Sequence, residues 1–414
     1  MKYGLIGKTL KHSFSKEIHE RIAGYGYELS EIAPEDLGGF LKKADFSGIN
    51  VTIPYKETVM PYLDGISDEA KKIGCVNTVI NRGGKLFGYN TDYYGLKSLI
   101  LKNGIDVSGK KALIMGGGGT YRTAKAVLSD LGAKEIIRVG LERQSPDVLY
   151  GDAAKRHADA KFILNATPVG MFPDCGGKLL SLADFPELEG YIDCVYNPLR
   201  TETVSEGIRL GKKAEGGLYM LVKQAEKAAE LFTGEDFNGV SDGIYEDLLR
   251  EKENIVLIGM PSSGKSTVGK IVAEKSGKKF VDTDELVLSE IKTPIKDYFE
   301  EYGEESFRKI EKSVVEKISS QNSLVIATGG GVPLSYGNVN ALKRNGRVYF
   351  IDRSPENLVP TSDRPTARTR SAIEELYKKR YAVYLASADV RTDGDRTAEK
   401  VAADILNEFY GKRE

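Results

Sequence analysis

The stretch GMPSSGKST, residues 259–267, limits the possible folds of this chain more than any other feature. It fits the pattern G-x-x-x-x-G-K-[ST], whose glycines let backbone N–H groups curl around a phosphate. In that pattern Lys265 reaches the outer phosphates and the hydroxyl of Ser266 binds Mg²⁺. The residues expected at the nucleotide are Gly259, Ser262, Ser263, Gly264, Lys265, Ser266 and Thr267.

The flanking sequence supports this interpretation. The apolar run NIVLIG precedes the stretch and predicts a buried strand, and STVGKIVAEKSG follows with helical spacing and ends at a glycine. A strand, a glycine-rich loop and a helix in this order predict a nucleotide-binding domain with a parallel sheet. The alternative is a glycine-rich turn with a surface lysine.

The length of 414 residues exceeds one ordinary hydrophobic core, so two or three domains are expected. In YEDLLREKENIVLIG a charged helix end runs directly into the strand before the phosphate loop, which predicts a boundary near residues 250–253. The second part then comprises residues 253–414. Because no linker rich in Gly, Ser or Pro separates the parts, we expect them to touch.

Composition excludes several functional classes. The 59 basic and 60 acidic residues balance, so neither nucleic acid nor an anionic membrane is favoured as a partner. No apolar run approaches the ~20 residues that span a bilayer, and MKYGLIGKTL predicts a short strand rather than a signal peptide.

The few cysteines and histidines offer no metal site or nucleophile triad. The cysteines lie far apart without metal spacing, which predicts reduced thiols and a cytoplasmic location. The cysteines are Cys75, Cys175 and Cys194, and the histidines are His12, His19 and His157.

The first part alternates apolar runs with helical segments, which predicts a parallel α/β architecture. KALIMGGGGTYRTAKAVLSDLGAKEIIRVG reads as strand, glycine turn, helix and strand. Gly116 permits the tight turn, and Gly118 lets a pyrophosphate approach the helix N-terminus. The pattern predicts a dinucleotide-binding Rossmann domain; the alternative is a domain of that shape without a cofactor.

Polar groups cluster outside that unit in HSFSKEIH, GINVTIPYK, CVNT and GYNTDYYG. Each has a structural explanation, such as turn capping, but together they suit a polyhydroxylated substrate. A lysine beside an aspartate can also give a proton to a carbonyl as hydride arrives. These groups are Ser13, Ser15, His19, Lys56, Asn77, Asn90 and Asp92.

These motifs, followed by GGGGTYR, NATPVGM, DCVYNPLRT and GGLYMLVKQA, resemble the successive signatures of shikimate dehydrogenase over residues 1–245. The resemblance implies reversible hydride transfer from NADPH to 3-dehydroshikimate, with Lys56 and Asp92 as the catalytic pair. It implies a substrate domain of residues 1–101 and 218–250, with the Rossmann domain, 102–217, inserted between them. Implied at the substrate are Ser13, Ser15, Thr52, Asn77, Asp92, Tyr196 and Gln224. Implied at the cofactor are Gly116, Gly118, Gly119, Thr120, Glu142, Arg143, Asn165, Thr167 and Gly217.

The cofactor side departs from the family pattern. Tyr121 stands where a small residue lets helix and strand pack closely, and Gly140-Leu141-Glu142 replaces Asn-Arg-Thr after the second strand. Glu142 on a free ribose 2′-hydroxyl would favour NAD, whereas Arg143 on a 2′-phosphate would favour NADP, which we expect. Only about 25 residues separate this strand from NATPVGM, which predicts a missing strand or helix.

In the second part, KKFVDTDELV predicts a strand that ends in Asp282 and Asp284. Strand alternation would point both carboxylates to one side, where one helps hold Mg²⁺ and the other orients a substrate hydroxyl. The same letters also make a good helix N-cap.

Further along, GEESFRKIE predicts a helix that carries Arg308, and LVIATGGGV predicts a buried strand before Gly329–Gly331. Backbone at such glycines can approach a ligand closely. Arg364 and Arg380 follow near the C-terminus, and arginines pair with carboxylate and phosphate, although either one alone is expected to be solvated.

Together the phosphate loop, D-x-D, FR followed by E, TGGG, RP and RY resemble shikimate kinase across residues 253–414. The resemblance implies that Lys265 and Ser266 handle ATP and Mg²⁺, that Asp282 supports the metal and that Asp284 holds the attacking hydroxyl. Implied at shikimate are Arg308, Gly330, Gly331 and Arg380, while Arg364 closes over the phosphoryl group. The lid stretch ENLVPTSDRP is short and lacks an arginine of the family pattern.

The two resemblances imply a bifunctional enzyme for consecutive steps toward chorismate and the aromatic amino acids. One half reduces 3-dehydroshikimate, and the other phosphorylates shikimate at its 3-hydroxyl with ATP. The alternatives are one inactive half, most readily the dehydrogenase, or a regulator that binds both ligand types without turnover. The sequence leaves open monomer or homodimer and the use of quinate, and it favours no sealed tunnel.

Overall fold

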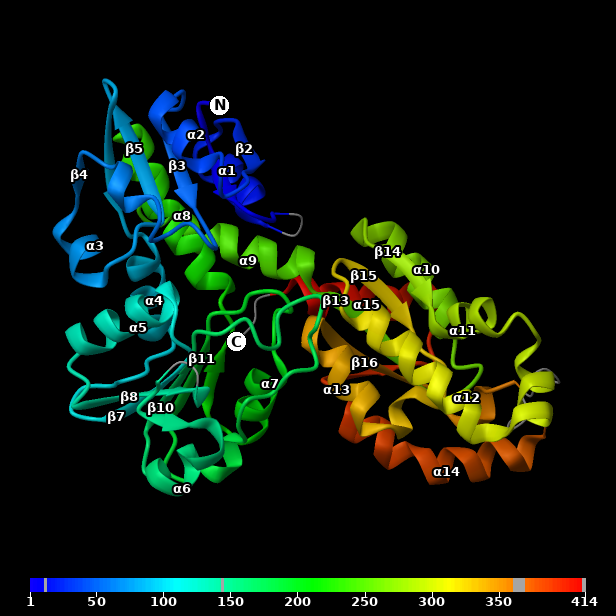
Figure 1. Ribbon diagram of the computed structural model, residues 1–414. Coiled ribbons are helices and arrows are strands. Elements are labelled where there is room, and N and C mark those ends of the chain that lie inside the picture. Colours follow the sequence, from blue (N-terminus) through cyan, green and yellow to red (C-terminus); the bar gives the residue numbers. More distant parts are fainter. Residues whose placement is uncertain (11–12, 143–144, 360–368, 412–414) are drawn as a thin grey trace. The chain divides into compact units, whose positions relative to one another are not determined.

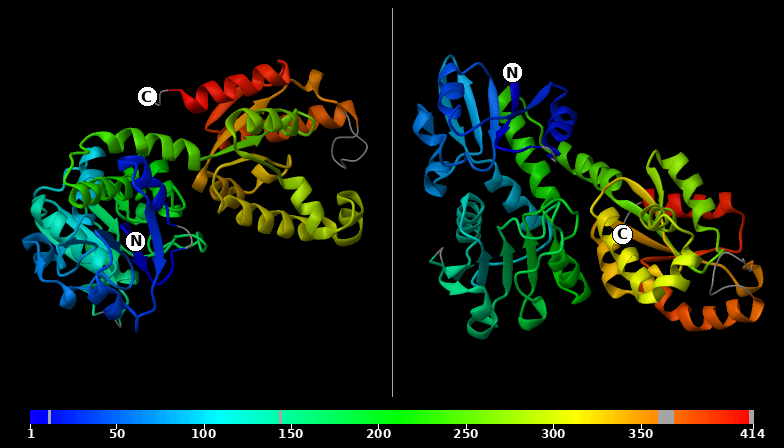
Figure 2. Two further views of the ribbon diagram at one scale, coloured as in Figure 1. Left: turned by 90° about the horizontal axis from the view of Figure 1, so that it is seen from above. Right: turned by 45° about the vertical axis from the view of Figure 1, so that its right-hand side comes forward.

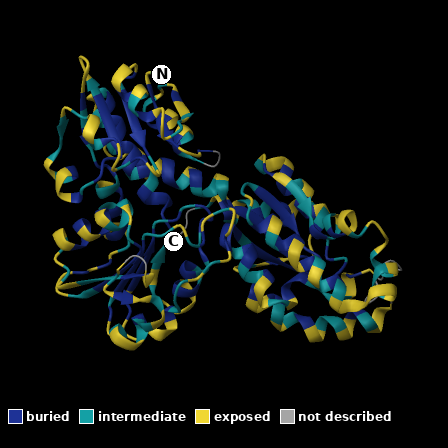
Figure 3. Cartoon of the chain, viewed as in Figure 1, coloured by how far each residue is buried: buried dark blue, intermediate teal, exposed yellow. Residues whose placement is uncertain are grey.

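The computed structural model describes residues 1–10, 13–142, 145–359 and 369–411 (Figure 1). The chain forms two compact units, Met1–Leu248 and Leu249–Glu414, called the first and the second unit below. Within each, the central strands are buried, and the exposed residues lie on helices, loops and edge strands (Figure 3). The division falls inside helix α9 (Val240–Lys252), close to the expected boundary. None of the helices in the described ranges has the length and apolar character needed to cross a membrane.

The first unit begins with a six-stranded sheet of order β2-β1-β3-β5-β6-β4. Strand β1 pairs in parallel with β2 and β3, but β5 pairs antiparallel with both β3 and β6. This sheet is therefore mixed rather than purely parallel, because Gly83 and Gly84, both at positive φ, turn β5 back into a hairpin with β6. The elements are β1 (Tyr3–Gly7), α1 (Ser15–Ala23), β2 (Tyr27–Glu31), α2 (Leu37–Lys43), β3 (Gly48–Val51), β4 (Gly65–Ile66), α3 (Asp68–Ile73), β5 (Thr78–Arg82) and β6 (Lys85–Tyr89).

Two helices from distant parts of the sequence pack against each other beside this sheet. Helix α4 (Asp92–Lys102) lies along α8 (Leu218–Thr233), which also contacts α1 and β5 (Figure 2). A Cβ at Gly95 would lie 2.4 Å from the carbonyl oxygen of Met220, so the glycine allows the close approach. The end of the first unit thus returns to the sheet that begins it.

The inserted sheet is fully parallel, with order β12-β11-β10-β7-β8-β9, which is the 3-2-1-4-5-6 order of the Rossmann fold. All six strands are present, but only the seven residues 141–147 connect β8 to β9. Since a helical crossover needs a dozen or more residues, the shortening removes a helix and keeps the strand. The elements are β7 (Lys111–Met115), α5 (Gly119–Asp130), β8 (Glu135–Gly140), β9 (Val148–Leu149), α6 (Ala153–His157), β10 (Phe162–Asn165), β11 (Gly190–Asp193), α7 (Glu202–Arg209) and β12 (Lys213–Glu215).

The second unit holds a parallel five-stranded sheet of order β14-β15-β13-β16-β17. Its central strand is buried on both faces: Val256 and Ile258 belong to one hydrophobic cluster, Ile255 and Leu257 to the other. The elements are β13 (Asn254–Ile258), α10 (Lys265–Ser276), β14 (Lys279–Asp282), α11 (Thr283–Ile291), α12 (Ile295–Ser319), β15 (Leu324–Ala327), α13 (Tyr336–Asn345), β16 (Gly346–Asp352), α14 (Arg370–Ser387), β17 (Val390–Asp393) and α15 (Ala398–Tyr410).

Candidate active sites

The first unit brings the predicted pair Lys56 and Asp92 together across 36 residues of chain. Lys56 Nζ donates to Asp92 Oδ2 at 2.5 Å, and the side chains are 18% and 13% exposed. Asp92 opens helix α4, where the helix dipole favours a carboxylate. Burial lowers the pKa of Lys56, but the charge and hydrogen bond of Asp92 outweigh it, so that this pKa lies above its ordinary value. Lys56 is therefore a protonated amine at neutral pH.

A buried amide network fixes the start of α4 and so the position of Asp92. Asn77 Oδ1 accepts the Thr91 backbone N–H at 2.7 Å, and Asn77 Nδ2 donates to Thr91 Oγ1 at 3.1 Å. Thr91 Oγ1 donates to Gln224 Oε1 at 3.3 Å, which ties α8 to the same point. Two predicted substrate residues, Asn77 and Gln224, thus meet beside the Lys56–Asp92 pair.

The predicted serines lie with Tyr196. Ser13 Oγ accepts the backbone N–H of Ser15, and it hydrogen-bonds the hydroxyl of Tyr196, whose pKa burial raises. Burial raises the pKa of the thiol of Cys194, two residues earlier, above its ordinary value. Thr52 follows β3, and its backbone N–H donates to the carbonyl of Ile6.

His19, which the sequence groups with these polar residues, has a structural role in the core. It is fully buried and stacks on Tyr27 with ring centroids 4.1 Å apart. Burial lowers its pKa to about 3. The ring is therefore neutral and belongs to the core between α1 and β2.

The glycine turn before α5 lies next to the Lys56–Asp92 pair. Gly116 has φ +113°, and a Cβ there would be 3.0 Å from Thr167 Cγ2. No atom lies within 4 Å of a Cβ placed on Gly118, so this side of the turn is open among the described residues. A Cβ on Gly119 would lie 3.8 Å from Lys56 Cδ. A ligand on the start of α5 would therefore lie beside the lysine stem.

The other predicted cofactor residues differ in what they can offer. Asn165 is buried, and its amide is used by the protein, accepting from Thr167 and donating to Asp193. Gly217 is buried against Cys194, whose carbonyl oxygen a Cβ would approach to 2.4 Å. Thr120, the second residue of α5, is half-buried.

The departures from the family pattern also have definite places. Tyr121, which stands where the family pattern has a small residue, is half-exposed, and its ring centroid lies 5.1 Å from Cζ of Arg138 in β8. Glu142 is exposed, and Arg143 lies outside the described residues.

In the second unit the phosphate loop has backbone N–H groups available for an anion. Ser262 and Gly264 have φ of 65° and 91°, a left-handed conformation that turns successive N–H groups to one side. Lys265 is buried, and Nζ donates to the carbonyls of Gly259 at 3.0 Å and Met260 at 2.8 Å. Ser263 Oγ is buried without a hydrogen-bond partner among the described atoms, which fits a loop built for a phosphate oxygen. Thr267 is exposed.

Two oxygens beside this loop suit a hard cation. Ser266 Oγ donates to Asp282 Oδ2 at 2.6 Å, so both lie where Mg²⁺ could bind them. Strand β14 ends at Asp282, whose other oxygen accepts the N–H of Asp284 and caps α11. The expectation that strand alternation aligns both carboxylates is therefore wrong: the cap positions Asp284 in the first turn of the helix.

Three other predicted side chains of the second unit, Asp284, Arg308 and Arg380, lie beside the glycines that follow β15. A Cβ on Gly329 would be 2.2 Å from Asp284 Oδ1, and one on Gly331 would be 2.3 Å from Arg308 Nη1. Arg380 Nη1 donates to the carbonyl of Gly330 at 3.0 Å. One carboxylate and two guanidinium groups thus surround a backbone without side chains. Arg364 lies outside the described residues.

Sequence reasoning missed one contributor, Arg353, and named another, the glutamate of FR followed by E, without giving it a role. Both carboxylate oxygens of Glu311 accept hydrogen bonds from Arg308 Nη1, at 2.9 and 2.8 Å, and the spacing of three residues on α12 is a signal of such a pair. Arg353 Nη1 lies 3.8 Å from a Cβ on Gly264, and its Nε is buried with no partner in the part of the chain that is described. No sequence pattern marks Arg353.

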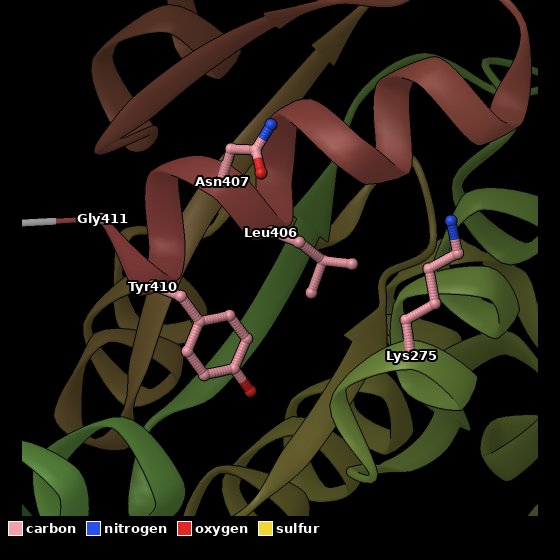
Figure 4. A pocket seen from close by; sticks show the side chains of 5 residues that line it. All are labelled: Lys275, Leu406, Asn407, Tyr410 and Gly411. Atoms are coloured by element: carbon pink, nitrogen blue, oxygen red, sulfur yellow. The ribbon is translucent and has the colours of Figure 1, made fainter.

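A separate hollow lies at the other end of α10 (Figure 4). It is lined by Lys275, Leu406, Asn407, Tyr410 and Gly411. Lys275 belongs to the last turn of α10, whereas the phosphate loop leads into its first turn. The hollow is therefore not part of the nucleotide site.

Two family profiles match the chain. The profile of the shikimate dehydrogenase substrate binding domain matches residues 5–79, and that of shikimate kinase matches residues 261–410. Among curated proteins, shikimate dehydrogenase (NADP(+)) of Clostridium beijerinckii is 37% identical over 266 residues, which cover 59% of this chain and 96% of that protein. The enzyme of the same name from Halothermothrix orenii is 37% identical over 261 residues, 56% of this chain and 90% of that protein.

Solved structures resemble the first unit. The crystal structure of shikimate dehydrogenase 1 from Peptoclostridium difficile is similar with 39% identity and a TM-score of 0.56, covering 60% of this chain and 98% of that one. A chorismate mutase/shikimate 5-dehydrogenase fusion protein from Clostridium acetobutylicum matches with 34% identity and a TM-score of 0.56, covering 59% and 96%. The enzyme of Thermus thermophilus in complex with NADP(H) and shikimate matches with 32% identity and a TM-score of 0.52, covering 58% and 97%.

Proposed function

Because this chain belongs to the shikimate dehydrogenase family and carries a shikimate kinase domain, we propose that it catalyses two consecutive reactions on one ring acid. The first reduces 3-dehydroshikimate to shikimate with NADPH, and the second transfers a phosphoryl group from ATP to the 3-hydroxyl. The observation that carries the proposal is that each unit holds its own set of polar groups suited to its reaction. These sets centre on Lys56–Asp92 and on Lys265 with Ser266–Asp282.

In the first reaction Lys56 gives a proton to the ketone oxygen. Its raised pKa keeps the amine charged at neutral pH, and Asp92 holds Nζ in place for the transfer. NADPH, when bound, supplies the hydride. The open glycine turn at Gly118, together with the N–H groups at the start of α5, would hold its pyrophosphate.

The substrate hydroxyls and carboxylate need several donors and acceptors. Ser13 and Tyr196 already form one polar group, and Ser15 adjoins it. The amides of Asn77 and Gln224 keep hydrogen-bonding capacity beyond their bonds to Thr91. We assign these groups, with Thr52, to the ring hydroxyls and carboxylate.

In the second reaction the residues position charge rather than form covalent bonds. Lys265 and the loop N–H groups hold the phosphates, and Ser266 with Asp282 would hold Mg²⁺, which neutralises phosphate charge when bound. Asp284, fixed at the start of α11, orients the attacking hydroxyl and takes its proton. Arg308 and Arg380 bind the shikimate carboxylate, and Arg364 is assigned to the phosphoryl group.

The two reactions act on the same position of the substrate ring. Reduction of the 3-ketone creates the 3-hydroxyl, and that hydroxyl is the acceptor in phosphoryl transfer. The product of one unit is therefore the substrate of the other without further chemistry. A cytoplasmic location, supported by three cysteines that form no disulfide among the described residues, agrees with the need for NADPH and ATP.

The test measures both activities on the full chain. Shikimate-dependent reduction of NADP⁺, with NAD⁺ in parallel, reports the first reaction, and shikimate-dependent ADP release reports the second. Both should appear, with NADP⁺ preferred. Absence of either activity would reduce the proposal to a single-function enzyme, and absence of both while the ligands bind would make the protein a sensor.

A further inference from the structure

The preference for NADPH needs a cation at the 2′-phosphate, and the structure offers one besides the expected Arg143, which lies outside the described residues. In Rossmann folds the group that reads the ribose stands about 20 residues after the first glycine of the turn. Arg138, in β8, follows Gly116 by 22 residues. Strand β8 is the direct neighbour of β7, which leads into the turn.

The guanidinium of Arg138 lies against the glycine turn. Its Nε donates to the carbonyl of Gly116 at 3.2 Å. A Cβ on Gly117 would lie 2.1 Å from Nη2 and 2.9 Å from Cζ, so only glycine leaves room for this placement. The ring of Tyr121 also contacts this guanidinium, with its centroid 5.1 Å from Cζ.

The charge of Arg138 is not neutralised within the described residues. No carboxylate there forms an ion pair with it, although Asp147 lies near. Asp147 Oδ2 instead accepts the backbone N–H of Arg138 at 2.8 Å, which pins the shortened β8–β9 connection to this strand. With Nε used by Gly116, the N–H groups of both Nη atoms remain for a ligand.

We propose that Arg138 recognises the 2′-phosphate of NADPH, with Tyr121 and Gly117 holding its guanidinium in position. The inference rests on the proposed dehydrogenase function and adds its cofactor specificity. Tyr121 and the short β8–β9 connection, which depart from the family pattern, are then parts of one arrangement. Glu142, which would favour NAD, is exposed two residues past the end of β8.

The experiment measures dissociation constants of NADP⁺ and NAD⁺ by titration calorimetry on the full chain. Saturating MgADP is present throughout to fill the nucleotide site of the second unit. The wild type should bind NADP⁺ more tightly than NAD⁺ by about tenfold or more, the factor expected for charge-assisted hydrogen bonds. In Arg138→Leu that preference should disappear because NADP⁺ binding weakens while NAD⁺ binding stays within about twofold.

Three further variants separate recognition from support of the turn. Arg138→Lys keeps the charge but loses the flat fork, and it should retain part of the preference. Tyr121→Phe keeps the ring face and should behave as wild type, whereas Tyr121→Leu should lose about two- to fivefold in preference. Arg156→Leu, an exposed arginine on α6, is the matched control and should change nothing.

Equal weakening of NADP⁺ and NAD⁺ in Arg138→Leu would make Arg138 a brace for the turn and overturn the inference. An unchanged preference would also overturn it. If Arg138→Leu does not fold, which thermal unfolding would show, Tyr121→Leu decides in the same way. A wild type that binds neither cofactor would instead contradict the proposed dehydrogenase.

Discussion

Both units place a lysine at the centre of a candidate site, but they give it different partners. Lys56 donates to the carboxylate of Asp92, whereas Lys265 donates to the backbone carbonyls of Gly259 and Met260. A carboxylate partner raises the pKa of the amine and holds it as a proton donor of fixed position. Carbonyl partners can be exchanged for phosphate oxygens without leaving a carboxylate behind. The partner, rather than the lysine, decides between proton transfer and anion binding.

The largest expected effect removes the proton donor. Lys56→Ala should lower dehydrogenase turnover by about 10²–10⁴-fold, the usual contribution of general acid catalysis, and leave ADP release unchanged. Rates of NADP⁺ reduction and ADP release on one preparation check this. The control is Lys71→Ala, which changes an exposed lysine on α3 and should retain both activities. Loss of kinase activity in Lys56→Ala would mean that the two lysines are not independent.

Lys265→Ala tests the lysine of the second unit in the same way. Removing the phosphate-binding charge should lower kinase turnover by about 10²–10³-fold, as for loss of one preorganised donor to a developing charge. Dehydrogenase activity should stay at the wild-type rate. Lys270→Ala, at an exposed position further along α10, serves as the control. A kinase that tolerates Lys265→Ala would show that this lysine does not hold phosphate.

Arg353 tests the anion-binding site of the second unit. It follows the end of β16 and adds positive charge beside the phosphate loop. Arg353→Leu should raise KM for ATP by about three- to tenfold with little change in kcat, because one partly solvated charge is lost. Initial rates over a range of ATP concentrations give both constants. Arg347→Leu, at the other end of the same strand, should leave KM unchanged. Equal effects of the two changes would argue for general charge loss.

The smallest expected effect shifts a pH profile. In the reducing direction Lys56 must be protonated, so wild-type activity should persist up to pH values above the ordinary lysine pKa of 10.5. Asp92→Asn removes the charge that raises this pKa and leaves burial, which lowers it. The alkaline limb of the residual activity should therefore move to lower pH. A limb at the wild-type position, measured with NADPH and 3-dehydroshikimate, would contradict the assignment of Lys56 as the acid.

Local backbone patterns were predictable from sequence, whereas contacts between distant segments were not, apart from the Lys56–Asp92 pair that the family resemblance implied. The turn at Gly116 and the loop at Gly264 are recognisable because only certain residues adopt their positive φ. Asp284 was placed on a strand because the end of a strand and the cap of a helix use the same letters. The hairpin at Gly83–Gly84 carried a local signal that the general α/β rhythm obscured.

The site residues show the same difference between local motifs and contacts that form only in the fold. The roles of Lys56 and Asp92 follow from motifs that stand close to them in sequence, and these roles remain predictions. Arg138 and Arg353 carry no such mark, since their importance depends on which glycine lies beneath the guanidinium. The contact of Tyr121 with Arg138 carries no mark either, because Arg138 lies on a strand outside the motif of Tyr121.

The amino group of Lys278 has a practical consequence for dividing the gene. It donates to the carbonyls of Arg250, Glu251 and Glu253 at 2.8, 2.8 and 2.9 Å, and so caps the last turn of α9. A separately expressed kinase that began at the first strand, β13, would leave this ammonium without these three acceptors. Cloning boundaries for an isolated kinase therefore belong at or before Leu249, even though the recognisable family sequence starts later.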